Sequence, residues 1–239
     1  MNDHSDHIDI DVWRFSLDWT REDIESQLDH LTSEEKKFIH RGIAPVIGER
    51  SALSRLGLRK ILSTYLDIEP HKIPLSIGEH GKPFLDNGVL KFNLSHCRDR
   101  AILVASTDTE LGVDLEKVRE ESPIEDLATR CFSEKEQKLW KAVPEQQRRI
   151  SFFHLWVQKE ALVKAHGNGM TIPLRKFEGV PDPQVLTGTI RSELPEIGSG
   201  NWNFQAFEES QQMRSAVMYR ARSAKIIQKD VEPVGLSRW

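Results

Sequence analysis

One order of predicted elements occurs twice along this chain of 239 residues. A long amphipathic helix is predicted over residues 48–66, where leucine and isoleucine recur at helical spacing. A second such helix is predicted over 152–166, ended by Gly167 and Gly169. Each helix is followed by a loop and a pair of short strands, at 89–94 with 101–106 and at 201–208 with 215–221. This repeated order predicts two similar halves, each with a helix packed on a sheet.

The predicted fold is therefore α/β (α+β), with two similar α/β subdomains in a pseudo-twofold arrangement and the active site in the cleft between them. We place the N-terminal subdomain at residues 1–109 and the C-terminal subdomain at 110–239. A strand over 8–15 is expected in the first subdomain, and a helix over 124–140 in the second. The residues themselves show no repeat, so the similarity of the halves rests on the order of the elements alone.

Composition narrows the class of protein. Hydrophobic residues make up 38% and charged residues 29%, as in ordinary globular proteins. The net charge of -4 gives no overall attraction for nucleic acid or anionic membranes, so any anion-binding site must be local. No apolar run approaches the roughly 20 residues of a membrane span, and the acidic start is unlike a signal peptide. The 2 cysteines form no CxxC pair, which suits free thiols in the cytoplasm.

The first candidate for chemistry is the segment GVDLE at residues 112–116. Residues two apart on a strand face the same way, so Asp114 and Glu116 would present paired carboxylates on one face. Gly112 would allow another backbone or a ligand to approach closely. Hard oxygen ligands of this kind suit Mg²⁺. The alternative interpretation is a solvated strand edge, because exposed acids are common.

The second candidate is one face of the later long helix. Trp156, Glu160 and Lys164 recur every four residues and so share that face, with Lys159 beside them. The alternative is a tryptophan at the margin of the core with a surface Glu–Lys pair. A separate apolar flank at residues 161–163 could serve the core and leave the charged face for a ligand.

The third candidate is a predicted strand end with mixed polar groups. Ser95 and His96 follow Asn93 there, and Lys82 precedes them along the chain. A hydroxyl, an imidazole and an ammonium near one turn could hold phosphate oxygens, and Arg50 on the earlier helix could extend that basic pocket. The alternative is a turn capped by Ser95 with ordinary surface charges around it.

Together these segments resemble the 4′-phosphopantetheinyl transferases. GVDLE at 112–116 and WVQKEALVK at 156–164 are similar to the paired signature of that family. GKP at 81–83 and FNLSH at 92–96 match its longer, Sfp-like (surfactin-synthetase-activating) branch. The resemblance covers roughly residues 36–173, with the motifs in the family's order.

The resemblance implies roles for individual residues. Asp114, Glu116 and Glu160 would hold one Mg²⁺ ion, which Mn²⁺ could replace. Glu160, Lys164 and Asp114 would be the catalytic residues. The implied coenzyme A-binding residues are Arg50, Lys82, Pro83, Ser95, His96, Lys159 and Lys164.

The resemblance also implies a reaction. The 4′-phosphopantetheine group of coenzyme A would move to a serine of an apo acyl or peptidyl carrier protein, and adenosine 3′,5′-bisphosphate would leave. Glu160 is expected to accept the serine proton, and Lys164 to stabilise developing charge. A cytoplasmic monomer with no nucleic-acid or membrane partner is the expectation. The carrier would dock on a local patch, for which residues 124–140 are a candidate.

Two other functions use the same residues. One is a Mg²⁺-dependent phosphotransferase or pyrophosphatase that needs no carrier protein. The other is a non-catalytic module that binds coenzyme A or a carrier protein. Loss of a metal ligand would favour the module, and the sequence keeps all three acids, Asp114, Glu116 and Glu160.

Overall fold

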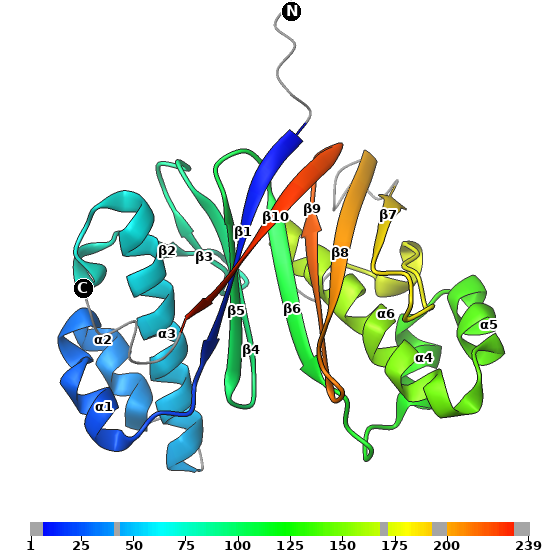
Figure 1. The fold of residues 1–239 in the computed structure, drawn as a ribbon, viewed down its shortest axis with the longest axis horizontal. Coiled ribbons are helices and arrows are strands. Elements are labelled where there is room, and N and C mark those ends of the chain that lie inside the picture. The colour runs from blue at the N-terminus through cyan, green and yellow to red at the C-terminus, as the bar shows by residue number, and fades with distance from the viewer. Residues whose placement is uncertain (1–6, 41–43, 168–171, 193–199, 232–239) are drawn as a thin grey trace, which may run out of the picture.

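Two four-stranded sheets lie at the centre of the structure, a computed structural model that describes residues 7–40, 44–167, 172–192 and 200–231 (Figure 1). The first sheet has the order β10-β1-β5-β4, with β1 (His7–Ser16), β4 (Lys91–Cys97), β5 (Arg100–Ser106) and β10 (Ser223–Val231). The second has the order β6-β9-β8-β7, with β6 (Leu111–Lys117), β7 (Thr187–Ser192), β8 (Gly200–Ser210) and β9 (Met213–Tyr219). A separate hairpin joins β2 (Leu75–Ile77) to β3 (Pro83–Leu85).

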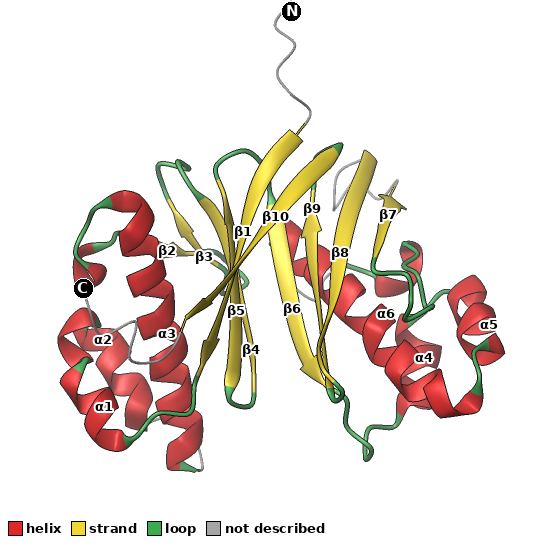
Figure 2. Cartoon of the chain, in the orientation of Figure 1, coloured by secondary structure: helices red, strands yellow, loops and turns green. Residues whose placement is uncertain are grey.

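One long helix covers the outer face of each sheet (Figure 2). Helix α3 (Pro45–Leu66) packs on the first sheet and α6 (Glu145–His166) on the second. The shorter helices are α1 (Arg21–Ser26), α2 (Ser33–Lys36), α4 (Ile124–Cys131) and α5 (Glu134–Ala142), with 3-10 turns η1 (Leu28–His30), η2 (Lys37–His40), η3 (Pro70–Lys72) and η5 (Leu174–Lys176). The expected α/β class, with a helix on a sheet in each half, is confirmed. No helix in the described ranges is long and apolar enough to cross a membrane.

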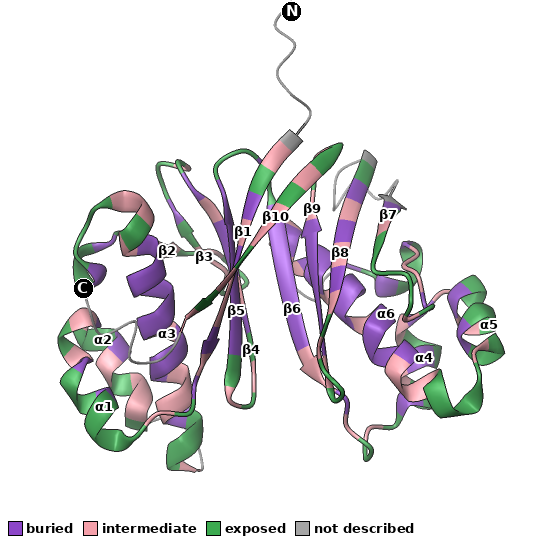
Figure 3. Cartoon of the chain, in the orientation of Figure 1, coloured by how far each residue is buried: buried purple, intermediate pink, exposed green. Residues whose placement is uncertain are grey.

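Strand alternation decides which side chains meet between the sheets and which meet the helices. In β1, Ile10 and Val12 join the apolar layer between the sheets, whereas Phe15 points to α3. In β6, Val113 and Leu115 belong to the layer between the sheets. The intervening residues of β6 therefore face α6, so the carboxylates of this strand lie on its helix side. Figure 3 shows that buried residues run along most of β5 and β6 and along both long helices.

Gly112 permits the close contact between β6 and α6. A Cβ atom built on this residue would collide with the backbone of Ala161 and Ala165. Any side chain here would push the helix away from the strand. The glycine therefore sets how closely the β6 carboxylates approach α6.

One expectation differs from the structure, and a second stays a prediction. The helix expected over 124–140 is two helices, because Ser133 starts a new one: its hydroxyl accepts from the Glu136 backbone N–H, and the Glu136 carboxylate accepts from the Ser133 N–H. The expected boundary at 109/110 falls between β5 and β6, where the chain passes from the first sheet to the second. Strand β10 then returns to the first sheet, parallel to β1, so the sheets do not divide cleanly at that boundary.

Candidate active site

Side chains of β4 connect the two sheets where β4 meets β6. The Val113 N–H donates to Asn93 Oδ1 at 2.8 Å, and the Leu115 N–H donates to Ser95 Oγ at 3.2 Å. Asn93 and Ser95 are both buried. Together they accept hydrogen bonds from the backbone N–H groups on either side of Asp114. These bonds fix the position of the Asp114 carboxylate between the two halves.

Lys164 of α6 extends to this contact between β4 and β6. Its Nζ donates to Asp114 Oδ1 at 2.6 Å and to Ser95 Oγ at 2.9 Å, and Ser95 Oγ lies 3.2 Å from Asp114 Oδ1. The structure thus brings together three of the predicted residues, one each from β4, β6 and α6. An ammonium, a carboxylate and a hydroxyl in mutual contact form a charge-assisted hydrogen-bond cluster.

The other two predicted acids lie beside this cluster. Burial raises the pKa of Glu160 to about 7, with a further rise from Asp114 and an opposing effect of Lys164. Burial and the charge of Asp114 also raise the pKa of Glu116, which accepts from Arg119 Nη2 at 3.2 Å. The charge of each acid therefore affects the pKa of its neighbours, because these negative groups lie close together.

The chemistry of these acids fits a divalent cation. Asp114 Oδ2 and Glu160 Oε1 are buried and have no hydrogen-bond partner among the residues that the structure describes. Buried carboxylate oxygens are normally paired, and hard oxygens of this kind are the ligands that Mg²⁺ prefers. Within the described ranges, no three acid, histidine or cysteine side chains are close enough to hold a metal together, so the acids would have to draw closer around one.

His96 faces the opposite side of β4 from Ser95. It lines a pocket of about 340 Å³ between α3, η2 and the start of β3, together with Pro83 and Arg55. The other lining residues are Phe38, Ser51, Ser54, Gly81 and Leu94. Pro83 and His96 are thus brought together as expected, but they lie on a different face of β4 from the carboxylates.

Arg55 is a lining residue that the sequence interpretation missed, and Arg50 does not line this pocket. A signal was available, because Ser51 and Arg55 are four apart and so share one face of α3. The Nε of Arg50 is buried and has no hydrogen-bond partner within the described ranges. The implied contact of Arg50 with the cofactor stays a prediction.

Lys82 ties the N-terminal half to the end of α6. Its Nζ donates to the Ala165 carbonyl at 2.9 Å and lies 3.4 Å from the Leu111 carbonyl. Burial lowers the pKa of Lys82 to about 8. Its ammonium thus donates a hydrogen bond to a carbonyl at the carboxyl end of α6, next to the turn at Gly167. These contacts use two of the three ammonium protons, and the implied contact of Lys82 with coenzyme A stays a prediction.

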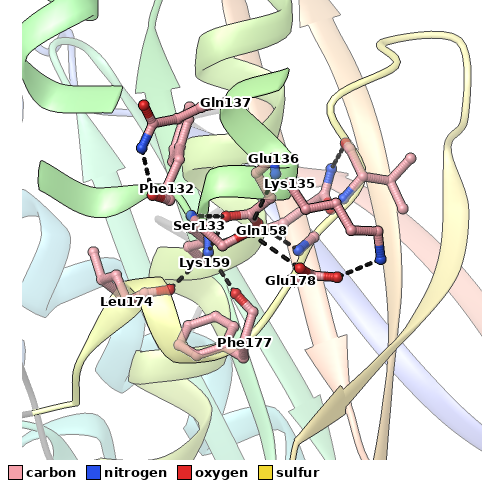
Figure 4. Close-up of polar contacts among 12 residues, drawn as sticks. Phe132, Ser133, Lys135, Glu136, Gln137, Gln158, Lys159, Leu174, Phe177 and Glu178 are labelled. Atoms are coloured by element: carbon pink, nitrogen blue, oxygen red, sulfur yellow. Dashed lines mark hydrogen bonds and ion pairs between the residues drawn. The ribbon is translucent and has the colours of Figure 1, made fainter. Parts of the chain in front are cut away.

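Lys159 lies elsewhere than expected (Figure 4). Its side chain is fully buried, and its ammonium contacts the Leu174 and Phe177 carbonyls at 2.7 Å each and Glu136 Oε2 at 2.8 Å. Glu136 is also held by the Gly179 N–H. These three acceptors use the three ammonium protons, so the structure gives Lys159 a packing role in place of the expected cofactor contact.

Comparison with known proteins agrees with this arrangement. The model of the 4′-phosphopantetheinyl transferase superfamily matches residues 110–217, and the model of the 4′-phosphopantetheinyl transferase N-terminal region matches residues 17–108. The 4′-phosphopantetheinyl transferase HetI of Nostoc sp. is 34% identical over 167 residues, which cover 68% of this chain and 70% of that protein.

Two other relatives are less identical in sequence. The 4′-phosphopantetheinyl transferase Sfp of Bacillus subtilis is 28% identical over 160 residues, covering 66% of this chain and 70% of that protein. The L-aminoadipate-semialdehyde dehydrogenase-phosphopantetheinyl transferase of Xenopus laevis is 32% identical over 189 residues, covering 74% of this chain and 63% of that protein. This chain is therefore an enzyme of the 4′-phosphopantetheinyl transferase superfamily.

Proposed function

We propose that this enzyme transfers the 4′-phosphopantetheine group of coenzyme A to a serine of an apo acyl or peptidyl carrier protein, releasing adenosine 3′,5′-bisphosphate. The observation that supports this most strongly is the pair of unpartnered, buried oxygens of Asp114 and Glu160 beside the ammonium of Lys164. A site with unsatisfied carboxylates and an adjacent cation suits a metal-dependent reaction on a diphosphate.

Asp114, Glu116 and Glu160 are the residues that would hold Mg²⁺, with Mn²⁺ as a possible substitute. Bound there, the ion would neutralise the diphosphate of coenzyme A and help to orient it. Lys164 would stabilise charge that develops as the bond to phosphorus breaks, since its Nζ already lies within 2.6 Å of Asp114. Ser95, which contacts both side chains, would position them.

Glu160 is the proposed base for the carrier serine. A general base must lie within reach of the reacting group, and Glu160 lies beside Asp114 and Lys164 in the proposed site. The proton would pass from the serine hydroxyl to the Glu160 carboxylate as the serine oxygen attacks phosphorus and the bond to adenosine 3′,5′-bisphosphate breaks. Near-normal turnover of Glu160→Gln with metal still bound would rule out this role.

The proposal includes a monomer that acts in the cytoplasm with coenzyme A and a carrier protein as its partners. The carrier would dock beside the carboxylates, and the end of α4 is a candidate surface. There Cys131 lies near enough to Glu160 for the carboxylate to raise the pKa of the thiol, after burial as the larger cause.

Intact-mass analysis of apo carrier proteins incubated with the enzyme, coenzyme A and Mg²⁺ tests the proposal. Transfer adds one phosphopantetheine group to the carrier, and EDTA abolishes that gain. Release of adenosine 3′,5′-bisphosphate without any carrier would favour a hydrolase. Binding of coenzyme A without either product, across acyl and peptidyl carriers, would favour a binding module.

A further inference from the structure

The three acids of the proposed metal site differ in what holds them. Asp114 Oδ2 and Glu160 Oε1 have no hydrogen-bond partner among the described residues, so each of these acids has an oxygen available for a cation. Glu116, on the same face of β6 as Asp114, is instead held by other side chains. Within the described ranges the three acids do not come close enough to hold one ion. The site therefore consists of two available acids and a third that is already occupied.

Arg119 is the charged residue that holds Glu116. Its Nη2 donates to Glu116 Oε2 at 3.2 Å, and the two side chains are 39% and 22% exposed. The thiol of Cys97, whose pKa burial raises, lies 4.0 Å from the same oxygen. The Trp156 indole also donates a hydrogen bond to this carboxylate. Of these three partners only Arg119 is a cation, so it contributes most of the electrostatic attraction that holds Glu116.

The backbone of Arg119 is fixed, whereas its side chain has a single partner. The Arg119 carbonyl accepts a hydrogen bond from Arg149 Nη1 at 2.7 Å, which attaches the segment after β6 to α6. In the described part of the chain the guanidinium bonds to Glu116 alone, and its buried Nε has no partner there. Loss of the contact with Glu116 would therefore break no other bond of the Arg119 side chain.

A divalent cation near Asp114 and Glu160 would compete with Arg119 for Glu116. A double charge attracts a carboxylate more strongly than a single charge at the same distance, and Mg²⁺ prefers carboxylate oxygens. The ion pair of Glu116 with Arg119 is partly exposed, and ion pairs of this kind are weak. Arg119 would also repel the incoming ion, because both are positive. The positions of these charges therefore favour an exchange of partners when metal binds.

We propose that Arg119 is a positioning residue that holds Glu116 apart from Asp114 and Glu160 in the metal-free enzyme and releases it when a divalent cation binds. This inference rests on the proposed metal site. Asp114 and Glu160 would meet the ion first, and Glu116 would join them after its ion pair breaks. Arg119 therefore lowers the affinity of the enzyme for metal.

Mn²⁺ binding to the enzyme alone, followed by electron paramagnetic resonance, tests the inference. Arg119→Gln should bind Mn²⁺ about 2- to 5-fold more tightly than the wild type, because the competing ion pair is lost. Arg119→Lys keeps the charge and should lie between the two. Lys117→Gln is the matched control, since it removes a positive charge from a neighbour that faces the other side of β6. Its affinity should change by less than about 1.5-fold at physiological salt, where distant charges are screened.

A double-mutant cycle separates the ion pair from simple repulsion of the metal. Glu116→Gln alone should weaken Mn²⁺ binding, and Arg119→Gln added to it should change the affinity little further. An equal gain from Arg119→Gln in both backgrounds would show that Arg119 acts by repulsion alone, and would overturn the inference. Thermal unfolding of each variant shows whether the fold is intact.

A crystal structure of the wild type with Mn²⁺ bound needs no variant. It should show Glu116 on the ion and no longer within hydrogen-bond distance of Arg119. An intact pair of Glu116 with Arg119 beside bound Mn²⁺ would overturn the inference. Weaker or unchanged Mn²⁺ binding by a folded Arg119→Gln would overturn it as well. Tighter binding by Arg119→Gln without transfer to any carrier would support the role of Arg119 and contradict the transferase proposal.

Discussion

Two neighbouring residues of α6, Lys159 and Glu160, belong to two charged clusters. The clusters differ in whether all of their polar atoms have hydrogen-bond partners. Lys159 pairs with Glu136, and the two side chains are 0% and 1% exposed. Every described polar atom of that pair has a partner from the protein. Glu160, by contrast, has one carboxylate oxygen with no partner in the described part of the chain, and so does Asp114 on β6.

The difference separates charges that serve folding from charges that serve a ligand. A buried ion pair whose remaining atoms are all hydrogen-bonded can be stable without any other molecule. Buried carboxylate oxygens without hydrogen-bond partners cost stability in the protein alone, and a bound metal cation would offset that cost. Substitutions in the two clusters should therefore change stability in opposite directions.

Lys159→Met should give the largest loss of stability. It leaves the Glu136 carboxylate buried without its cation, which costs about 3 to 5 kcal/mol. Urea unfolding followed by circular dichroism measures the loss. The double variant Glu136→Gln with Lys159→Met should recover much of it, because no buried charge is left. A loss below about 1 kcal/mol in the single variant would show that the pair is not needed for folding.

Glu160→Gln should do the reverse in metal-free buffer. The raised pKa of Glu160 means that ionisation disfavours the folded state, so wild-type stability falls as pH rises from the ordinary value of 4.5 to about 7. At pH 8 the amide should stabilise the protein by about 1 to 3 kcal/mol, while carrier modification falls at least about 100-fold. Unfolding in EDTA and intact-mass rates measure the two effects. A destabilised Glu160→Gln would contradict the comparison.

His154 lies outside both clusters, and its protonation should make the stability of the protein depend on pH. Burial, and then the charge of Arg214, lower its pKa from 6.5 to about 4. The unfolded chain therefore binds the proton first, and stability present above pH 6.5 is lost as pH falls toward 4. We expect a loss of about 2 kcal/mol from this residue between pH 7 and pH 5. His154→Asn should flatten that part of the urea-unfolding profile, whereas His71→Asn at an exposed site should not.

Asn93→Ala should have the smallest effect on stability among these variants, about 1 to 2 kcal/mol, because it leaves the buried Val113 N–H without an acceptor. It should also weaken metal-dependent transfer, because Val113 precedes Asp114. Asn93→Ser offers a hydroxyl acceptor of the kind that Ser95 gives to the Leu115 N–H, and should preserve more of the stability. Equal loss in both variants would contradict the hydrogen-bond explanation.

The sequence predicted the elements and the acid cluster better than the partners of single charges. Periodicity placed both long helices, and the two-residue spacing put Asp114 and Glu116 on one face of β6. The break at Ser133 was also readable, since Ser133 and Glu136 form a capping box. The pairing of β10 with β1 could not be predicted from the sequence, because it joins strands from opposite ends of the chain.

Lys159 shows why individual roles were harder to predict. Its acceptors come from α5 and from the η5 turn, so only the folded chain reveals that no proton is left for a ligand. Arg55 shows the converse. It is one of several arginines in α3, and only the meeting of α3 with β4 places it opposite His96.

Mn²⁺ binding, followed by electron paramagnetic resonance in the presence of coenzyme A, tests most directly whether the unpartnered carboxylates form the cation site. We expect a bound Mn²⁺ that Mg²⁺ displaces, that Asp114→Ala loses, and that the exposed-acid control Asp29→Ala retains. Equal Mn²⁺ binding by the wild type and by a folded Asp114→Ala, Glu160→Gln double variant would contradict it.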